Sequence, residues 1–131
     1  MNKVVAIIAG EPNSISSEII FKTWNLKKKH KIKSFFIIGS FNLLSKQKKQ
    51  LKFKTKIKKI NKNFTINDLN GGAIPIYDVS YNQKKPYEKL STKSNKYIFN
   101  CFDLALKLIR EKKIYGLINC PVAKEYLFQH K

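Results

Sequence analysis

The 131-residue sequence lacks the features that mark several large classes of protein. No apolar run approaches the ~18 residues that a membrane-spanning helix needs, which excludes a membrane protein. The two cysteines, Cys101 and Cys120, are too few for a disulfide framework, and we interpret them as reduced thiols. The sequence carries neither a G-x-G-x-x-G dinucleotide fingerprint nor a Walker A lysine, so neither of these two phosphate-binding loops is present.

Acidic residues are also scarce, and the charge is strongly one-sided. Only 8 Asp and Glu stand against 27 Lys and Arg, which gives a formal net charge of +19. Such a charge attracts nucleic acid or other polyanions without sequence preference. However, Arg110 is the only arginine, whereas nucleic-acid readers depend on the bidentate guanidinium fork. Because Lys, Ile and Asn are over-used together while Ala is scarce, we interpret the charge as the drift of an AT-rich coding sequence, and we disfavour nucleic acid as the partner.

The residues that are present suit one folded domain. The chain has 17 Ile, 9 Phe and 6 Tyr, which excludes a disordered chain, and its length is typical of a single domain. The apolar stretch at residues 3–9 is too short for a signal peptide and runs into Gly10-Glu11-Pro12. We therefore expect a buried strand there and a cytoplasmic protein.

Apolar runs and helical periodicity alternate along the chain. Continuous apolar runs predict buried strands at residues 3–9 and 34–38, and a further strand is predicted at residues 115–119. Apolar spacings of three and four predict helices over residues 17–30, 40–50 and 94–113, and from residue 122 onward. This alternation predicts an α/β fold with a mostly parallel sheet flanked by helices.

Two weaker segments are assigned to strands as well. Residues 51–62 alternate lysine with Phe53, Thr55 and Ile57, which predicts an edge strand with a solvated lysine face. Residues 74–79 predict a short strand, and Pro75 places it near an edge. The polar residues 80–91 are expected to form a loop.

Serines stand where two of the helices are expected to begin. Ser16 or Ser17 is expected to cap the helix over residues 17–30, and Ser40 the helix that follows it. Ile19, Ile20 and Trp24 are expected to form the inner face of the first of these helices.

Two loops are candidate ligand sites. In a parallel sheet, ligands bind where strands end and helices begin, and residues 10–18 and 119–124 occupy two such places. Both loops offer an anionic ligand backbone amides and hydroxyls, together with one carboxylate and one ammonium group. The competing interpretations are a tight turn with a helix cap for the first loop and a solvated side chain for Lys124.

The same two loops carry a resemblance to a known family. Residues 10–18, Gly-Glu-Pro-Asn-Ser-Ile-Ser-Ser-Glu, resemble the G-E-P-x-G-I-G-P-E opening of the 4-hydroxythreonine-4-phosphate dehydrogenases. Residues 115–124 are similar to that family's hydrophobic strand ending in T-G-P-x-x-K. Both motifs occur in the family's order, and the resemblance spans the whole chain.

The resemblance implies an enzyme of pyridoxal 5′-phosphate (vitamin B6) biosynthesis. Family members oxidise 4-phosphooxy-L-threonine with NAD⁺, and the product loses CO₂ to give 3-amino-2-oxopropyl phosphate. It also implies a fold similar to that of isocitrate and isopropylmalate dehydrogenases, a homodimer, and a divalent metal (Zn, Mg or Co) held by three histidines. On this basis Gly10, Glu11 and Pro12 are expected to shape a loop facing the small phosphorylated amino-acid substrate, and Lys124 to meet its phosphate or carboxylate.

The sequence departs from the family pattern at several positions. Ser14 and Ser16 replace two glycines of the first motif, and Ser17 replaces its proline. Asn119-Cys120 replaces the Thr-Gly pair of the second motif. Side chains at positions where glycines allow close backbone approach are expected to narrow the site.

The length of the chain is the largest departure. Family members are more than twice as long, and their G-H-T motif and three metal-binding histidines would follow Lys131. Of the two histidines present, we interpret His30 as solvated, and His130 does not fall on a ligand position. We therefore interpret residues 1–131 as the N-terminal α/β portion of a truncated dehydrogenase, which alone binds neither metal nor NAD and cannot carry out the oxidation.

Two other functions remain open from the sequence. One is a small basic protein that binds nucleic acid or another polyanion, for which Phe53 and Phe64 provide too few aromatic rings for a stacking platform. The other is a remnant that binds a full-length partner subunit through exposed core surface. A thiol nucleophile is not expected, because Cys120 has no acid–base partner at a catalytic spacing and is expected to pack at the strand end.

Overall fold

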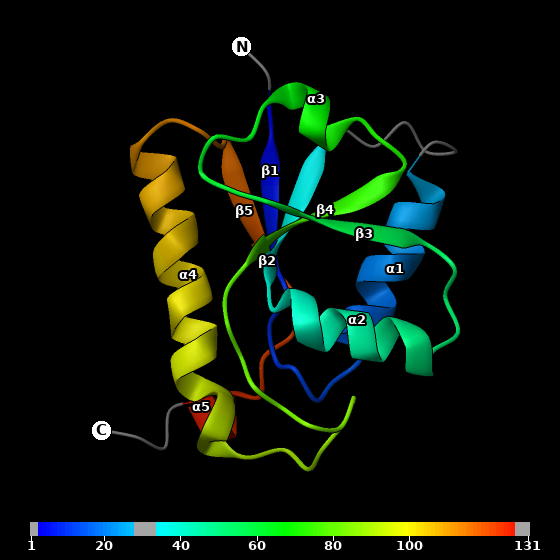
Figure 1. The fold of residues 1–131 in the computed structure, drawn as a ribbon. Helices are drawn as coiled ribbons and strands as arrows, with labels where there is room; N and C mark the ends of the chain where they lie inside the picture. The colour runs from blue at the N-terminus through cyan, green and yellow to red at the C-terminus, as the bar shows by residue number, and fades with distance from the viewer. Residues whose placement is uncertain (1–2, 28–33, 128–131) are drawn as a thin grey trace.

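The computed structural model describes residues 3–27 and 34–127. Within these residues, five strands form one parallel sheet in the order β3-β4-β2-β1-β5 (Figure 1). The strands are β1 (Val5–Ile8), β2 (Phe35–Gly39), β3 (Lys56–Ile60), β4 (Ala73–Asp78) and β5 (Gly116–Asn119). The helices are α1 (Ser16–Leu26), α2 (Phe41–Gln50), α3 (Ile66–Leu69), α4 (Asn95–Arg110) and α5 (Lys124–Leu127), with a 3₁₀ turn η1 at Thr92–Ser94. The predicted α/β class with a parallel sheet is confirmed.

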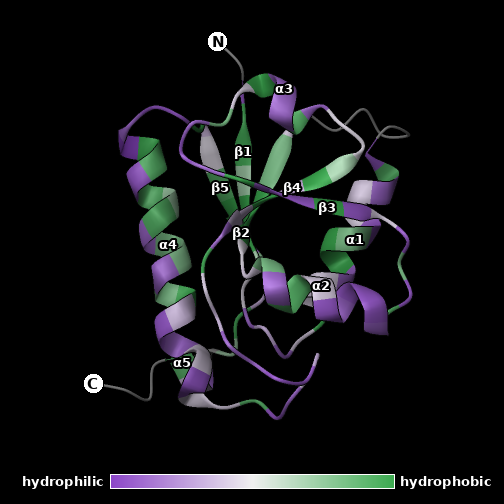
Figure 2. Cartoon of the chain, in the orientation of Figure 1, coloured by the Kyte–Doolittle hydropathy of each residue, from purple (hydrophilic) through white to green (hydrophobic). Residues whose placement is uncertain are grey.

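The central strand β2 shows why the sheet is buried on both faces. Phe36 and Ile38 pack into the core on the side of α4, whereas Phe35 and Ile37 pack into the core on the side of α1 and α2. The two helical layers lie on opposite sides of the sheet in Figure 1, and β1 and β2 are its most apolar strands in Figure 2. Such double burial produces the continuous apolar runs seen in the sequence.

The start of α1 differs from the prediction. Neither Ser16 nor Ser17 caps the helix; instead the Ser14 hydroxyl accepts a hydrogen bond from the Ser16 N–H at 3.1 Å. The Ser17 hydroxyl lies 2.8 Å from the hydroxyl of Tyr87 and is therefore engaged away from its own helix. The prediction failed because the helix begins at Ser16, so Ser16 and Ser17 lie within its first turn and Ile15 occupies the cap position.

The inner face of α1 is also rotated from the predicted one. Ile20 and Phe21 are buried and Trp24 packs against the same core, but Ile19 is 38% exposed. The ring of Phe21 stacks on Phe53, with their centroids 5.2 Å apart. Phe53 lies beyond α2 in the sequence. The apolar pattern of α1 alone therefore does not indicate that Phe21 lies on the buried face.

The other two long helices match the prediction closely. Ser40 caps α2, because its hydroxyl accepts a hydrogen bond from the Leu43 N–H at 3.1 Å. The buried residues of α4 include most of its predicted stripe: Tyr97, Ile98, Cys101, Ala105 and Leu108. In the described part of the chain, every helix is too short or too polar to span a bilayer.

The two weaker strands are only partly as predicted. β3 lies at the edge of the sheet as expected, but it is shorter than residues 51–62. β4 lies next to the edge strand β3, so it is near an edge as predicted, but it is paired on both sides and Pro75 is buried. The ladder between β2 and β4 begins at the Ile37–Ile76 pair, one residue after the proline, so the missing N–H of Pro75 does not interrupt it.

Candidate functional site

The loops that follow β1 and β5 lie against each other at the carboxyl edge of the sheet. β1 and β5 are paired in parallel up to Ile8 and Asn119, so both loops leave the sheet at the same level. The N–H of Glu11 donates a hydrogen bond to the carbonyl oxygen of Pro121 at 3.0 Å. The expected meeting of the two loops is therefore observed.

Gly10 makes this contact possible. Its φ is +76°, a conformation that residues with a side chain rarely adopt. A Cβ atom at this position would lie 2.7 Å from the Pro121 oxygen and 2.8 Å from the Cys120 oxygen. The backbone of the first loop touches the backbone of the second, and glycine is the residue that fits between them.

Glu11 and Pro12 are buried and held by hydrogen bonds. The Glu11 side chain accepts a hydrogen bond from the Asn13 N–H at 2.9 Å, and another from the Ser94 hydroxyl at 3.3 Å. Glu11 is only 3% exposed. The Pro12 carbonyl accepts a hydrogen bond from the Gln47 side chain at 2.6 Å. In this conformation these groups satisfy one another, so a ligand would have to displace existing hydrogen bonds.

A pocket shared by the two loops stays a prediction, because the small cavity beside the first loop is lined by no residue of the second loop. The cavity beside Gly10–Pro12, α2 and α4 has a volume of about 10 Å³, which suits one water molecule. Neither a small phosphorylated amino acid nor a dinucleotide fits there. Serines contribute to the filling: the Ser14 hydroxyl donates to the Glu11 carbonyl at 2.8 Å and lies 2.7 Å from the Ser16 hydroxyl. The role of Gly10, Glu11 and Pro12 toward a substrate stays a prediction.

A segment that the sequence predicted only as a polar loop packs across the first loop. We refer to residues 80–91 as the strap; it runs from the end of β4 beneath α2 to η1 (Figure 1). The Asn13 and Gln83 side-chain amides exchange two hydrogen bonds, at 3.1 and 2.9 Å, and the Glu88 N–H donates to the Asn13 oxygen at 2.8 Å. In the sequence, the polar side chains of this segment predict a solvated loop. In the structure, they form hydrogen bonds that hold the strap against the first loop.

Gln47 joins three segments at this site. Its side-chain nitrogen donates to the carbonyl oxygens of Pro12, at 2.6 Å, and of Pro86, at 2.8 Å. The residue is 2% exposed and lies on α2. It connects α2, the first loop and the strap. Most of its neighbours in the sequence are lysines and glutamine, a pattern that predicts a solvated position. The burial of Gln47 could therefore not be predicted from the sequence.

The described residues do not fit the metal that the family resemblance implies. Across residues 3–27 and 34–127, no three His, Cys, Asp or Glu side chains are grouped so that they could hold a metal ion. His30 and His130, and our interpretation of them, lie outside the described residues. We therefore derive no chemical step through a metal. Lys124 is the first residue of α5, and its contact with a phosphate or carboxylate stays a prediction.

The two cysteines are buried, neutral thiols. Cys120 follows β5 and is 6% exposed, and burial raises its pKa to about 11. Cys101 lies on α4 and is fully buried, and its pKa is raised to about 12, mainly by burial. The predicted packing of Cys120 at the strand end is confirmed.

We expect this burial to make the stability of the protein fall in alkaline solution. An unfolded thiol ionises near its ordinary pKa of 9.0, below the pKa of the folded thiols. The thiols therefore contribute their full stabilisation below pH 9 and lose it as the pH rises toward the folded values. The loss is about 1.4 kcal/mol per pH unit for each thiol. Urea denaturation at a series of pH values measures it.

The matched control is the variant Cys101→Ala with Cys120→Ala. Burial also raises the pKa of Tyr97, so part of the alkaline loss of stability remains in this variant. Wild-type protein is expected to lose more stability than the variant between pH 9 and about 11, the folded pKa of Cys120. Equal pH dependence in the two proteins contradicts the prediction.

The sheet order and the joined loops define the class of the protein. It is a parallel α/β protein whose candidate site lies where β1 and β5 end. A crystal structure of a 4-hydroxythreonine-4-phosphate dehydrogenase from Burkholderia phymatum has the same fold, with a TM-score of 0.82 at 19% sequence identity. The match covers 97% of this chain and 38% of that one.

Sequence comparison places the chain in a family. Residues 31–131 match the family described as "Pyridoxal phosphate biosynthetic protein PdxA", and the chain belongs to it. It is 31% identical over 125 residues to a 4-hydroxythreonine-4-phosphate dehydrogenase from Sulfurihydrogenibium sp. (strain YO3AOP1), covering 95% of this chain. It is 27% identical to a protein of the same name from Zymomonas mobilis, covering 97% of this chain. The chain spans 37% and 36%, respectively, of these two relatives.

Proposed function

We propose that this chain is the N-terminal, substrate-side portion of an NAD-dependent 4-hydroxythreonine-4-phosphate dehydrogenase of vitamin B6 biosynthesis. The match of residues 31–131 to the PdxA family supports this proposal. The structural observation that carries it is the hydrogen bond from the Glu11 N–H to the Pro121 oxygen. This bond joins the two motifs that resemble the dehydrogenases, although they lie far apart in the sequence.

In the complete enzyme, 4-phosphooxy-L-threonine is oxidised and decarboxylated to 3-amino-2-oxopropyl phosphate. We assign NAD and a divalent metal to that complete enzyme, together with a cytoplasmic location and a homodimeric state. The present residues contribute positioning: Gly10 lets the two loops touch, Glu11 and Pro12 fix the first loop, and Lys124 offers an ammonium group to the phosphate or carboxylate. The C-terminal portion provides the metal site.

We predict that the purified 131-residue chain does not reduce NAD⁺ in the presence of 4-phosphooxy-L-threonine. The chain has two histidines, so a single copy cannot provide the three-histidine metal site of the family. Appearance of NADH absorbance measures the reaction. Turnover by this chain without any added protein contradicts the proposal that it is an incomplete portion.

A chimera tests whether the portion belongs to the site. In it, residues 1–131 replace the matching part of the Sulfurihydrogenibium relative, which supplies the remainder. We expect the chimera to form NADH, and Glu11→Gln to reduce its turnover by about tenfold or more, because a fixed carboxylate that organises the loop is lost. Glu111→Gln is the matched control, since Glu111 is exposed at the C-terminal end of α4, outside both motifs. A folded chimera that responds equally to both substitutions contradicts the role of Glu11.

A further inference from the structure

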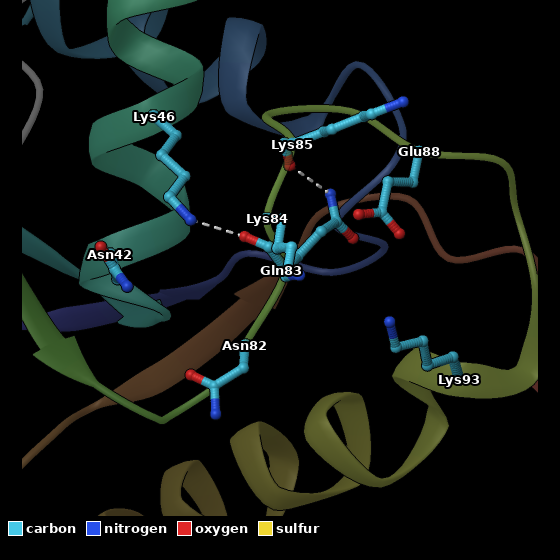
Figure 3. Close-up of a pocket in the computed structure, with 8 residues that line it drawn as sticks. All are labelled: Asn42, Lys46, Asn82, Gln83, Lys84, Lys85, Glu88 and Lys93. Carbon is cyan, nitrogen blue, oxygen red and sulfur yellow. Dashed lines mark hydrogen bonds between the residues drawn. The ribbon is translucent and has the colours of Figure 1, made fainter.

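A second cavity lies on the outer side of the strap, and its lining is strongly basic (Figure 3). Its volume is about 420 Å³, within the range of about 300–1,000 Å³ that small-molecule sites occupy. It is lined by Asn42, Lys46, Asn82, Gln83, Lys84, Lys85, Glu88 and Lys93. We propose that this cavity binds a compact oligophosphate, either free or as the diphosphate group of a nucleotide.

The charge of the lining favours a multivalent anion. Four of the described lining residues are lysines and one, Glu88, is acidic, so the formal charge of the lining is +3 (four minus one). In the described part of the chain, the ion pair present is that of Lys22 with Glu18, on α1. No carboxylate therefore lies within salt-bridge distance of the four ammonium groups in those residues. Like charges gathered in a concave site raise the local concentration of anions.

One of these ammonium groups is already positioned. The Lys46 Nζ donates to the Gln83 carbonyl oxygen at 2.6 Å, a contact drawn in Figure 3. Gln83 is itself 5% exposed, and its side chain is fixed to Asn13 at 2.9 Å and to the Lys85 carbonyl at 2.9 Å. An ammonium group has three N–H donors, so Lys46 keeps two for a ligand while its position is set by a fixed part of the strap.

The remaining lining selects a compact and hydrophilic ligand. The neutral side chains among the described lining residues are the amides of Asn42, Asn82 and Gln83. No aromatic side chain is among the described lining residues, so the cavity offers no stacking platform for bases. Lysine binds phosphate as a point charge through charge-assisted hydrogen bonds. These properties favour clustered phosphate groups over an extended nucleic acid.

Isothermal titration calorimetry of the 131-residue chain at fixed ionic strength tests the proposal. Inorganic phosphate, pyrophosphate, tripolyphosphate and ADP are the probes, and we expect affinity to rise with the number of phosphate groups. Lys46→Gln and Lys93→Gln are each expected to weaken pyrophosphate binding by about tenfold, since each removes a charged hydrogen-bond donor. Among the described residues, Lys93 is linked to the strap by its backbone N–H, which donates to the Ser91 hydroxyl, and not by its ammonium group. The Lys93→Gln variant therefore separates ligand binding from any loosening that follows the loss of Lys46.

Lys56→Gln and Lys59→Gln are the matched controls, because both lysines are exposed on the edge strand β3. They remove the same charge outside the cavity and are expected to change the affinity by less than about twofold. Equal weakening by cavity and edge variants, or no binding of any probe, overturns the proposal, as does an oligonucleotide that displaces pyrophosphate from the cavity lysines. Tighter binding of ADP than of pyrophosphate identifies a nucleotide as the source; equal binding identifies free oligophosphate. The measurement involves no turnover, so its outcome is independent of the proposed dehydrogenase.

Discussion

Replacing Gly10 with alanine is expected to lower the free energy of unfolding by about 2–5 kcal/mol. Two costs add in this variant. The left-handed backbone, with φ at +76°, disfavours a residue that has a Cβ atom. The new Cβ would also meet the carbonyl oxygens of Pro121 and Cys120 at 2.7 and 2.8 Å. Because these atoms belong to the backbone, no side-chain rotation relieves the contact, and the two loops must separate.

Urea denaturation of Gly10→Ala and Gly116→Ala provides the comparison. Gly116 begins β5, its φ lies outside the left-handed range, and a Cβ atom there would meet nothing within 4 Å. Its substitution is expected to change the free energy of unfolding by less than about 1 kcal/mol. If the two variants are equally stable, the contact between the loops does not contribute to the fold. If Gly10→Ala alone is destabilised, the first loop needs glycine at position 10 because the backbone of the second loop lies so close to it.

The sheet could be predicted because its central strands carry their own signal. β1 and β2 are covered by helices on both faces, so nearly every residue in them is apolar. The cap of α2 is equally local, since Ser40 and Leu43 are three residues apart. The lysines of β3 likewise indicate an edge strand, although its exposed residues, Lys56 and Lys59, are three positions apart and lie on opposite faces. These features depend on neighbouring residues alone.

The errors fall where a contact joins distant segments. The buried face of α1 follows from the stacking of Phe21 on Phe53, which lies beyond α2. Pro75 indicates a strand near an edge, but it does not indicate that β4 is paired on both sides, which depends on where the ladder with β2 begins. Propensity describes one residue and its near neighbours, and it cannot supply the pairing that makes an internal proline acceptable.

The candidate site likewise combines features that the sequence predicts with features that depend on contacts between distant segments. The family motifs indicated which two loops matter, and the bond from Glu11 to Pro121 brings them together. Nothing in the sequence predicts that the cavity beside the first loop has a volume of only about 10 Å³, or that the strap covers this loop through Asn13 and Gln83. Asparagine and glutamine commonly lie at the surface, so their sequence pattern gives no sign that the amides of Asn13 and Gln83 pair with each other in a part-buried site.

Replacing Gln47 with methionine is expected to lower the free energy of unfolding by about 3 kcal/mol. Methionine keeps the unbranched shape of the side chain but has no N–H donor. The carbonyl oxygens of Pro12 and Pro86 would each lose a hydrogen bond, of 2.6 and 2.8 Å, in a site from which water is largely excluded. The strap would also lose its link to α2 by Gln47, so trypsin is expected to cleave faster after Lys84, an exposed strap residue.

Two further variants separate the lost donors from other effects of Gln47→Met. Gln50→Met makes the same change at the exposed last residue of α2 and is expected to alter the free energy of unfolding by less than about 0.5 kcal/mol. Gln47→Glu keeps the size of the side chain but, when ionised, replaces its donors with acceptors. It should therefore destabilise the protein at least as much as methionine does. If Gln47→Glu is as stable as the wild type and its strap is not cleaved, Gln47 does not hold the strap by donating hydrogen bonds. In that case the volume of the side chain alone would explain why residue 47 is buried.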